Sequence, residues 1–239
     1  MNNEKPTIGV LALQGDFAEH IVMLMQCGSK VITVKHAWQL DELDGLVIPG
    51  GESTTIAKLT GVDSLDDIFS VIRKKALAGM PIYGTCMGSI FLAKEIEGSS
   101  QGRLALMDIK VRRNAFGPQK FSSQINLAIP ELGIEDYPAV FIRAPIVLSV
   151  KANVQVLCQI EQGIVMARQD NLLVTAFHPE LTNDLAIHRY FVAMVMAHCA
   201  TKELAQNGLR QREPVLAQNT GQASYAESSA VSELAGFQV

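Results

Sequence analysis

One cysteine, Cys86, lies between two glycines in the run Gly-Thr-Cys-Met-Gly at 84–88. The apolar residues 80–83 before it predict a buried strand, and residues 89–97 predict a helix. A strand, a tight turn and a helix hold a nucleophile out at the end of a sheet, as in the Gly-x-Ser-x-Gly elbow. Glycines suit such a turn because a Cβ would crowd the turn or the neighbouring strand. The helix N-terminus favours thiolate, so Cys86 is a candidate nucleophile, with a buried structural cysteine as the alternative.

A histidine and a carboxylate follow another predicted strand, at residues 171–177. His178 and Glu180 flank Pro179, which stiffens the link because its ring fixes φ. In extended backbone, residues two apart point to the same side, so imidazole and carboxylate would share one side of the sheet edge. A general base oriented by a carboxylate needs this pairing. The alternative is a histidine bonded to a backbone carbonyl beside a solvated glutamate.

Two adjacent glycines, Gly50 and Gly51, end a third apolar run at 45–48. Such a pair lets the backbone approach a ligand closely, and we expect its peptide to flip. Glu52 and Ser53 come next and suit the start of a helix, so an ordinary turn before a capped helix is the competing interpretation.

The remaining pattern predicts an α/β fold. Strands at 7–13, 30–34 and 45–48, with a helix capped by Asp16 and closed by Gly28, favour a doubly wound parallel sheet. Beyond residue 104 the chain reads as strands joined by turns, which adds antiparallel strands to the parallel core. The expected strands there are 104–112, 121–129, 139–143, 154–160, 163–168 and 171–177; further helices are expected at 65–78 and 185–200.

Ligands bind beyond the carboxyl ends of the strands in open α/β sheets. The double glycine, the cysteine elbow and the His-Pro-Glu segment each follow a strand end, so all three can converge on one crevice. Thiol, imidazole and carboxylate together would form a Cys-His-Glu triad, and acyl transfer is the reaction such a triad serves.

Composition narrows the class of protein. The 239 residues are 48% hydrophobic and 18% charged, which fits one large, well-cored domain. A net charge of −4 indicates neither a nucleic-acid footprint nor a basic membrane-binding face. The four cysteines include no Cys-x-x-Cys pair, which argues against a metal site or disulfide framework. No apolar signal core opens the chain, and the apolar helix at 185–200 carries charged residues, so we expect a cytoplasmic protein without a membrane span.

The composition changes near residue 202. We predict one domain over residues 1–203 and a disordered tail over 204–239, because residues 207–239 are rich in Gln, Ser, Ala, Asn and Gly and have weak apolar periodicity.

The segments around Cys86 and His178 together resemble the triad of class I glutamine amidotransferases. Further runs are similar to one branch, the glutaminase subunit of pyridoxal 5′-phosphate synthase (PdxT family), over about residues 7–195. These runs are Leu-Gln-Gly at 13–15, Pro-Gly-Gly-Glu-Ser-Thr-Thr at 49–55, Arg-Arg-Asn-Ala-Phe-Gly at 112–117, Phe-Ile-Arg-Ala-Pro at 141–145 and the segment 177–191. The resemblance implies a three-layer α/β fold with a mostly parallel central sheet, added antiparallel strands and a flavodoxin-like core.

The resemblance also implies roles for individual residues. Cys86 would attack the side-chain amide of L-glutamine, His178 would move the protons, and Glu180 would orient the imidazole. Backbone N–H groups of Gly51 and Met87 would stabilise the oxyanion, one such donor being typically worth ~3 kcal/mol. The implied glutamine-binding residues are Gly51, Glu52, Ser53, Arg113, Ile142 and Arg143; Glu52 suits the substrate ammonium and an arginine suits its carboxylate.

The implied partner is the (β/α)8-barrel synthase subunit of pyridoxal 5′-phosphate synthase, in a large hetero-oligomer that receives the ammonia. Gln14 and the helix after it would lie near this interface. The resemblance implies no cofactor for the glutaminase itself, which would form its domain from residues 1–203.

The sequence departs from the branch at Met87, Pro118 and Lys120, and in the tail. Met87 replaces a small residue and would crowd the oxyanion side. The alternatives are a triad glutaminase that serves another synthase, a γ-glutamyl hydrolase, and a non-catalytic docking module of the same fold.

Overall fold

The computed structural model describes residues 5–13, 15–51, 68–115 and 123–210. The chain divides into two units, Met1–Glu203 and Leu204–Val239. Of the second unit, only the backbone of residues 204–210 and the side chains of 204 and 205 belong to the described part. Residues 204–210 are helical, against the disorder predicted for them, and the rest of the predicted tail, 211–239, lies outside the described residues.

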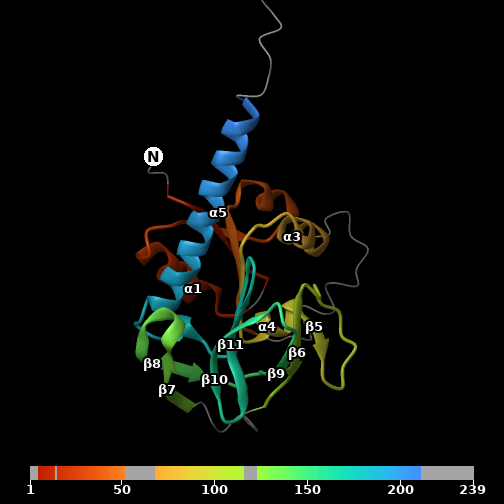
Figure 1. Cartoon of the computed structure of the whole chain (residues 1–239), viewed down its shortest axis with the longest axis vertical. Coiled ribbons are helices and arrows are strands. Elements are labelled where there is room, and N and C mark those ends of the chain that lie inside the picture. Colours follow the sequence, from red (N-terminus) through yellow and green to blue (C-terminus); the bar gives the residue numbers. More distant parts are fainter. Residues whose placement is uncertain (1–4, 14, 52–67, 116–122, 211–239) are drawn as a thin grey trace, which may run out of the picture. The chain divides into compact units, whose positions relative to one another are not determined.

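The described elements follow one another as strands and helices in the first half and mostly as strands in the second (Figure 1). The strands are β1 (Thr7–Leu11), β2 (Lys30–Val34), β3 (Gly45–Ile48), β4 (Ile82–Thr85), β5 (Ala93–Ile96), β6 (Met107–Arg112), β7 (Ser123–Ile129), β8 (Ile134–Phe141), β9 (Ile146–Val150), β10 (Gln155–Ile160), β11 (Gly163–Gln169) and β12 (Leu172–Thr175). The α-helices are α1 (Phe17–Gln26), α3 (Ile68–Leu77), α4 (Met87–Leu92) and α5 (Ala186–Arg210), and the 3-10 turns are η1 (Ala37–Glu42), η2 (Pro130–Leu132) and η3 (Pro179–Leu181).

One large sheet has the strand order β2-β1-β3-β4-β12-β11-β9-β6-β5, with β10 paired to β11. The strands from β2 to β12 pair in parallel, and the pairs between β12, β11, β9 and β6 are antiparallel. A separate hairpin joins β7 to β8. The predicted mostly parallel sheet with added antiparallel strands is confirmed.

Helices cover both faces of the parallel strands. Along β3 and β4, Val47 and Tyr83 pack into a core with side chains of α1 and α5, whereas Leu46, Ile48 and Ile82 pack with α3 and α4 on the other face. This alternation follows from the period of two in a strand, and burial on both faces explains why these strands read as continuous apolar runs. The result is three layers, with α1 and α5 apart from α3 in Figure 1.

Two local predictions were wrong. The helix expected at 89–97 ends at Leu92, and β5 begins at Ala93, because this segment pairs in parallel with β6. Pairing with a distant strand overrides the local helical pattern there. The last helix runs to Arg210, ten residues beyond its expected end. Strand β9 had not been predicted, and residues 65–67 of the third expected helix lie outside the described part.

Within the described residues, no helix combines the length and apolar character that a membrane crossing requires.

Candidate active site

Cys86 lies at a sharp turn between β4 and α4. Its φ is 46° and its ψ is −105°, a conformation that L-residues rarely adopt. The flanking glycines are required by close contacts: a Cβ on Gly84 would lie 2.6 Å from the backbone of Gly88, and one on Gly88 would lie 2.1 Å from the carbonyl oxygen of Ile48 in β3. The predicted elbow therefore has the geometry that the two glycines indicated.

The register of the sheet brings His178 beside Cys86. Strands β4 and β12 are parallel neighbours, with Thr85 opposite Thr175, and the Cys86 N–H donates to the Thr175 carbonyl at 2.8 Å. The chain then passes from Thr175 to His178, whose own N–H donates to the Val140 carbonyl at 2.8 Å. Two segments that are distant in sequence thus meet at the carboxyl ends of adjacent strands, as expected for this class of sheet.

His178 and Glu180 form a buried pair. The distance from His178 Nδ1 to Glu180 Oε1 is 2.7 Å, and the two residues are 3% and 4% exposed. The pairing was predicted, but its reason was wrong: Glu180 lies in the 3-10 turn η3, not in extended backbone. The turn brings the Glu180 carboxylate back onto the ring of His178, the residue just before the turn.

The protonation of His178 follows from its neighbours. Burial alone lowers the pKa of this imidazole, but Cys86 on one side and Glu180 on the other raise it to about 11, well above the ordinary 6.5. Because Nδ1 faces a carboxylate, it carries a proton, and Nε2 has no hydrogen-bond partner among the described residues. Nε2 is therefore the atom left to exchange a proton with the thiol or with a bound substrate.

Most of the predicted site residues line one cavity of about 430 Å³. Its lining comprises Asp16, Gly51, Cys86, Met87, Ile90, Arg113, Asn114, Ile142, Arg143 and His178. Glu180 lies behind His178, away from this lining. The predicted residues Gln14, Glu52 and Ser53, and the departures Pro118 and Lys120, lie outside the described residues.

Strained backbone is concentrated around this cavity. Five non-glycine residues of the described part have positive φ, and three of them, Cys86, Asn114 and Arg143, line the cavity. Gly50 is equally constrained, because a Cβ there would lie 2.5 Å from the His178 ring and 3.4 Å from the Cys86 Cβ. Such strain persists only where the surrounding structure enforces it, and it is common at functional sites.

Two arginines supply positive charge to the cavity from loops. Arg113 follows β6 and donates to Gln101 Oε1 at 2.7 Å, and Arg143 follows β8. The two loops are joined where the Ala115 N–H donates to the Ala144 carbonyl at 2.9 Å. A guanidinium suits a carboxylate ligand, so this side of the cavity can hold the acid end of an amino acid.

Sequence reasoning missed Asp16, Ile90 and Asn114 as lining residues. Asp16 was expected to cap α1; it stands at the cap position but makes no capping hydrogen bond, and its carboxylate lies 3.5 Å from His178 Nδ1. Its place just after Leu-Gln-Gly was the available signal. Asn114 belongs to the Arg-Arg-Asn-Ala-Phe-Gly run, and its positive φ of 49° is more common for asparagine than for most residues.

Asp16, His178 and Glu180 each place one potential ligand atom within 4.8 Å of the others, the one such group found among the described side chains. His178 Nδ1 cannot coordinate a metal ion while it donates to Glu180 Oε1 at 2.7 Å. We therefore interpret this group as the polar surroundings of a general base.

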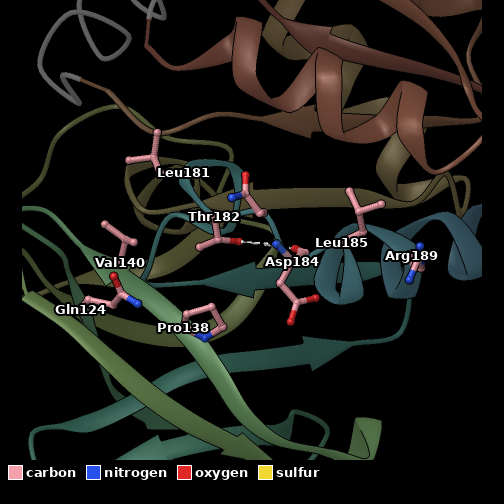
Figure 2. A pocket seen from close by; sticks show the side chains of 9 residues that line it. Gln124, Pro138, Val140, Leu181, Thr182, Asp184, Leu185 and Arg189 are labelled. Atoms are coloured by element: carbon pink, nitrogen blue, oxygen red, sulfur yellow. Dashed lines mark hydrogen bonds between the residues drawn. The ribbon is translucent and has the colours of Figure 1, made fainter.

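A larger cavity, of about 640 Å³, lies elsewhere, between the β7–β8 hairpin and the start of α5. Figure 2 shows its lining, in which the Asp184 N–H donates to Thr182 Oγ1 at 3.2 Å. The residues that line it include no cysteine and no histidine. We place the candidate active site in the smaller cavity, because of the two only that one holds the thiol and the imidazole.

Comparisons with known proteins show the family of this chain. The model of the SNO glutamine amidotransferase family matches residues 10–197. A protein from Carboxydothermus hydrogenoformans, named pyridoxal 5′-phosphate synthase subunit PdxT, is 55% identical over 188 residues, covering 79% of this chain and 97% of that protein. The protein of the same name from Brevibacillus brevis is 52% identical over 188 residues, covering 79% and 96%.

Solved structures give the same result for the fold. A crystal structure described as a glutamine amidotransferase superposes with a TM-score of 0.72 at 42% identity, covering 79% of this chain and 98% of that one. A structure of PurLQS from Thermotoga maritima shares the fold alone, with a TM-score of 0.55 at 16% identity over 83% of this chain and 99% of that one. The chain belongs to the SNO glutamine amidotransferase family.

Proposed function

We propose that this chain is the glutaminase subunit of pyridoxal 5′-phosphate synthase and hydrolyses L-glutamine to L-glutamate and ammonia. The observation that carries the proposal is the His178–Glu180 pair, 2.7 Å apart, beside the strained Cys86 elbow in one cavity. Relatives named PdxT, at 52–55% identity over nearly their whole length, support this synthase over another one.

The first half of the reaction makes a thioester. Because the pKa of His178 is raised to about 11, the proton of the Cys86 thiol already resides on His178 Nε2, and the sulfur attacks the amide carbon of the glutamine side chain. Glu180 holds the resulting imidazolium through Nδ1, the role that a carboxylate plays behind any triad histidine. Nε2 then returns the proton to the leaving nitrogen, ammonia departs, and a γ-glutamyl thioester remains on Cys86.

The second half reverses the proton path. Water gives a proton to His178 Nε2 and attacks the thioester carbon, and the sulfur leaves with that proton. The backbone N–H groups of Gly51 and Met87 stabilise the oxyanion in both halves; both residues line the cavity beside Cys86. The Met87 side chain is 2% exposed and belongs to the same buried core cluster as Ile90 and Phe91.

Other residues of the same cavity recognise the substrate. Arg113 and Arg143 bind the α-carboxylate of glutamine, Ile142 lines the path of its side chain, and Glu52 and Ser53 bind its amino end with Gly51. The positive charge and position of the two arginines in the lining support this orientation.

The ammonia passes to the (β/α)8-barrel synthase subunit, which docks on this chain through Gln14 and α1 in a large hetero-oligomer. Docking flips the Gly50–Gly51 peptide and completes the oxyanion site. The complex functions in the cytoplasm and requires no cofactor on the glutaminase.

The test is ammonia release from glutamine with and without the synthase subunit. We expect release by the wild type to be stimulated by the partner and Cys86→Ala to release none. Cys158→Ala is the matched control, because Cys158 is also a buried free cysteine but lies on β10, outside the active-site cavity. Equal activity of the wild type and Cys86→Ala would show that Cys86 is not the nucleophile and would contradict the proposal.

A further inference from the structure

Two buried histidines lie behind the Cys86–His178–Glu180 group and have no part in the reaction described above. His20 comes from α1 and His188 from α5, and both are 0% exposed. They pack against Tyr83 of β4, with ring centroids 6.3 Å from it in each case. Burial of two imidazoles in an apolar core is costly unless their nitrogens are bonded, so the partner of each nitrogen matters.

The contacts of His20 run toward the active site. Its Nδ1 is 3.0 Å from His188 Nε2. Its Nε2 is 3.1 Å from Thr85 Oγ1, on the residue before the nucleophile, and 3.3 Å from Glu180 Oε2. Thr85 Oγ1 also accepts the Gly50 N–H at 3.0 Å. One imidazole thus touches the carboxylate behind the general base and the residue that anchors both Cys86 and Gly50.

Glu180 needs such a contact. One of its oxygens, Oε1, bonds His178, whereas Oε2 is buried and has no hydrogen-bond partner among the described residues. Burial raises the pKa of this carboxyl group, which opposes the ionised form that His178 requires. An N–H group beside Oε2 favours the charged carboxylate, and His20 Nε2 lies 3.3 Å from that oxygen.

The tautomers of the two histidines can be assigned from the same contacts. Burial first, and then the charges of His188 and His178, lower the pKa of His20 well below 6.5, so its ring is neutral and carries one proton. If that proton were on Nδ1, a bare Nε2 would face the carboxylate, and the proton of His188 would be on its own Nδ1, which has no partner among the described residues. With the proton on His20 Nε2, His188 donates from Nε2, and only a lone pair on His188 Nδ1 stays unpaired, which costs less than an orphaned N–H.

We propose that His20 is a positioning residue for the triad: its Nε2–H donates to Thr85 Oγ1 and lies beside Glu180 Oε2, where it favours the carboxylate, and His188 holds His20 in that tautomer. This inference rests on the proposed function, since it assigns a role behind the proposed general base. His20 does not line the substrate cavity, so it acts on the reaction only through Glu180 and Thr85.

The test compares two substitutions of His20 in the full chain with the synthase subunit present. His20→Leu removes the donor, and we expect kcat to fall about 10- to 100-fold with KM unchanged. His20→Gln keeps an amide N–H at the place of Nε2, and we expect it to recover most of kcat. His198→Leu is the control, because this histidine also lies on a helix, α5, but stands beside Gly79, away from the triad.

A structural role alone predicts a different result. If His20 only filled space, His20→Leu would keep kcat, or both variants would lose activity in proportion to their loss of folded protein by thermal unfolding; either outcome overturns the inference. Nitrogen-15 NMR of the wild-type histidines gives a readout independent of activity. We expect His20 to be protonated on Nε2 and bare on Nδ1 at neutral pH, and a proton on Nδ1 would overturn the assignment.

The same assays separate this inference from the proposed function. Activity of Cys86→Ala equal to that of the wild type contradicts the proposed function itself. An inactive Cys86→Ala beside a His20→Leu with unchanged kcat contradicts only the role of His20.

Discussion

The two halves of the sheet contribute different things to the site. The parallel half, β2-β1-β3-β4-β12, ends in Gly50, Cys86, His178 and Glu180. The half that contains antiparallel pairs contributes Arg113 after β6, and Ile142 and Arg143 between β8 and β9. The reacting groups thus follow strands of the parallel half, whereas three of the groups expected to recognise substrate, Arg113, Ile142 and Arg143, stand on loops of the other half.

This difference shows which side chains of the site are positioned most firmly. Adjacent parallel strands fix Cys86 against Thr175 by a backbone hydrogen bond of 2.8 Å, and buried contacts with His20 and His178 hold Glu180. The loop residues Asn114 and Arg143 have positive φ, and the Ala115 N–H bonds the Ala144 carbonyl between their two loops. Changes in the parallel half should therefore reduce kcat, and changes in the loops should raise KM.

The largest effect is expected in the parallel half, for Glu180→Gln. An amide cannot hold the imidazolium of His178, so kcat should fall roughly 10²- to 10⁴-fold while KM for glutamine stays near the wild-type value. Steady-state ammonia release in the presence of the synthase subunit measures this. Glu161→Gln, in the exposed turn between β10 and β11, is the control. A normal kcat for Glu180→Gln would mean that the 2.7 Å pair has no catalytic role.

A smaller effect, on KM instead of kcat, is expected for the loops that carry Arg113 and Arg143. Arg143→Gln and Arg113→Gln each remove a positive charge from the cavity, and KM should rise about 10- to 100-fold with kcat changed less. Arg168→Gln is the control. Arg168 donates a hydrogen bond of 2.9 Å to the Tyr190 hydroxyl and does not line this cavity. If these variants lost kcat at an unchanged KM, the proposed division between the two halves would be wrong.

We expect the free energy of unfolding to depend on pH because His188 and His20 are buried against the parallel half of the sheet. Burial lowers the pKa of His188 from 6.5 to about 4, so between these values the unfolded chain binds a proton that the folded chain does not. Stability must then fall as the pH drops from 6.5 to 4, by about 3 kcal/mol at most for this residue. His20, also with a lowered pKa, adds to the loss in the same direction.

The measurement is urea unfolding of the wild type and His188→Gln over that pH range, and the variant should show the shallower slope. His178 does not affect this comparison. Because its pKa is raised, its contribution to folding stability is complete below pH 6.5 and is lost only as the pH rises toward 11. Parallel slopes for the two proteins would show that His188 is not buried in its neutral form.

The smallest effect is expected at the edge of the antiparallel half. Arg112 and Glu97 pair across β6 and the end of β5 through an Nε to Oε2 contact of 2.5 Å, but both side chains are largely in water. Because solvent screens such pairs, Arg112→Ala should leave both activity and melting temperature close to the wild type. A clear loss of glutaminase activity would mean that this edge reaches the site through the neighbouring Arg113.

Much of the site was accessible from sequence because its signals are local. Glycines at fixed offsets from Cys86, a histidine and a glutamate two apart, and apolar runs before each of them depend only on neighbours along the chain. The same locality explains the errors. Residues 93–96 look helical by spacing and become β5 because β6 pairs with them, and Glu180 meets His178 through a 3-10 turn instead of a strand.

The sequence by itself determined the layered α/β fold, the identity of the candidate nucleophile and its partners, and the strand ends on which they stand, since backbone propensity and side-chain chemistry belong to single short segments. Only the tertiary structure decided that Asp16 faces His178 and that His20 and His188 meet behind Glu180. Those contacts join residues up to 168 positions apart. A helical histidine carries no mark of whether it will face solvent, apolar core or a carboxylate until the helices have packed on the sheet.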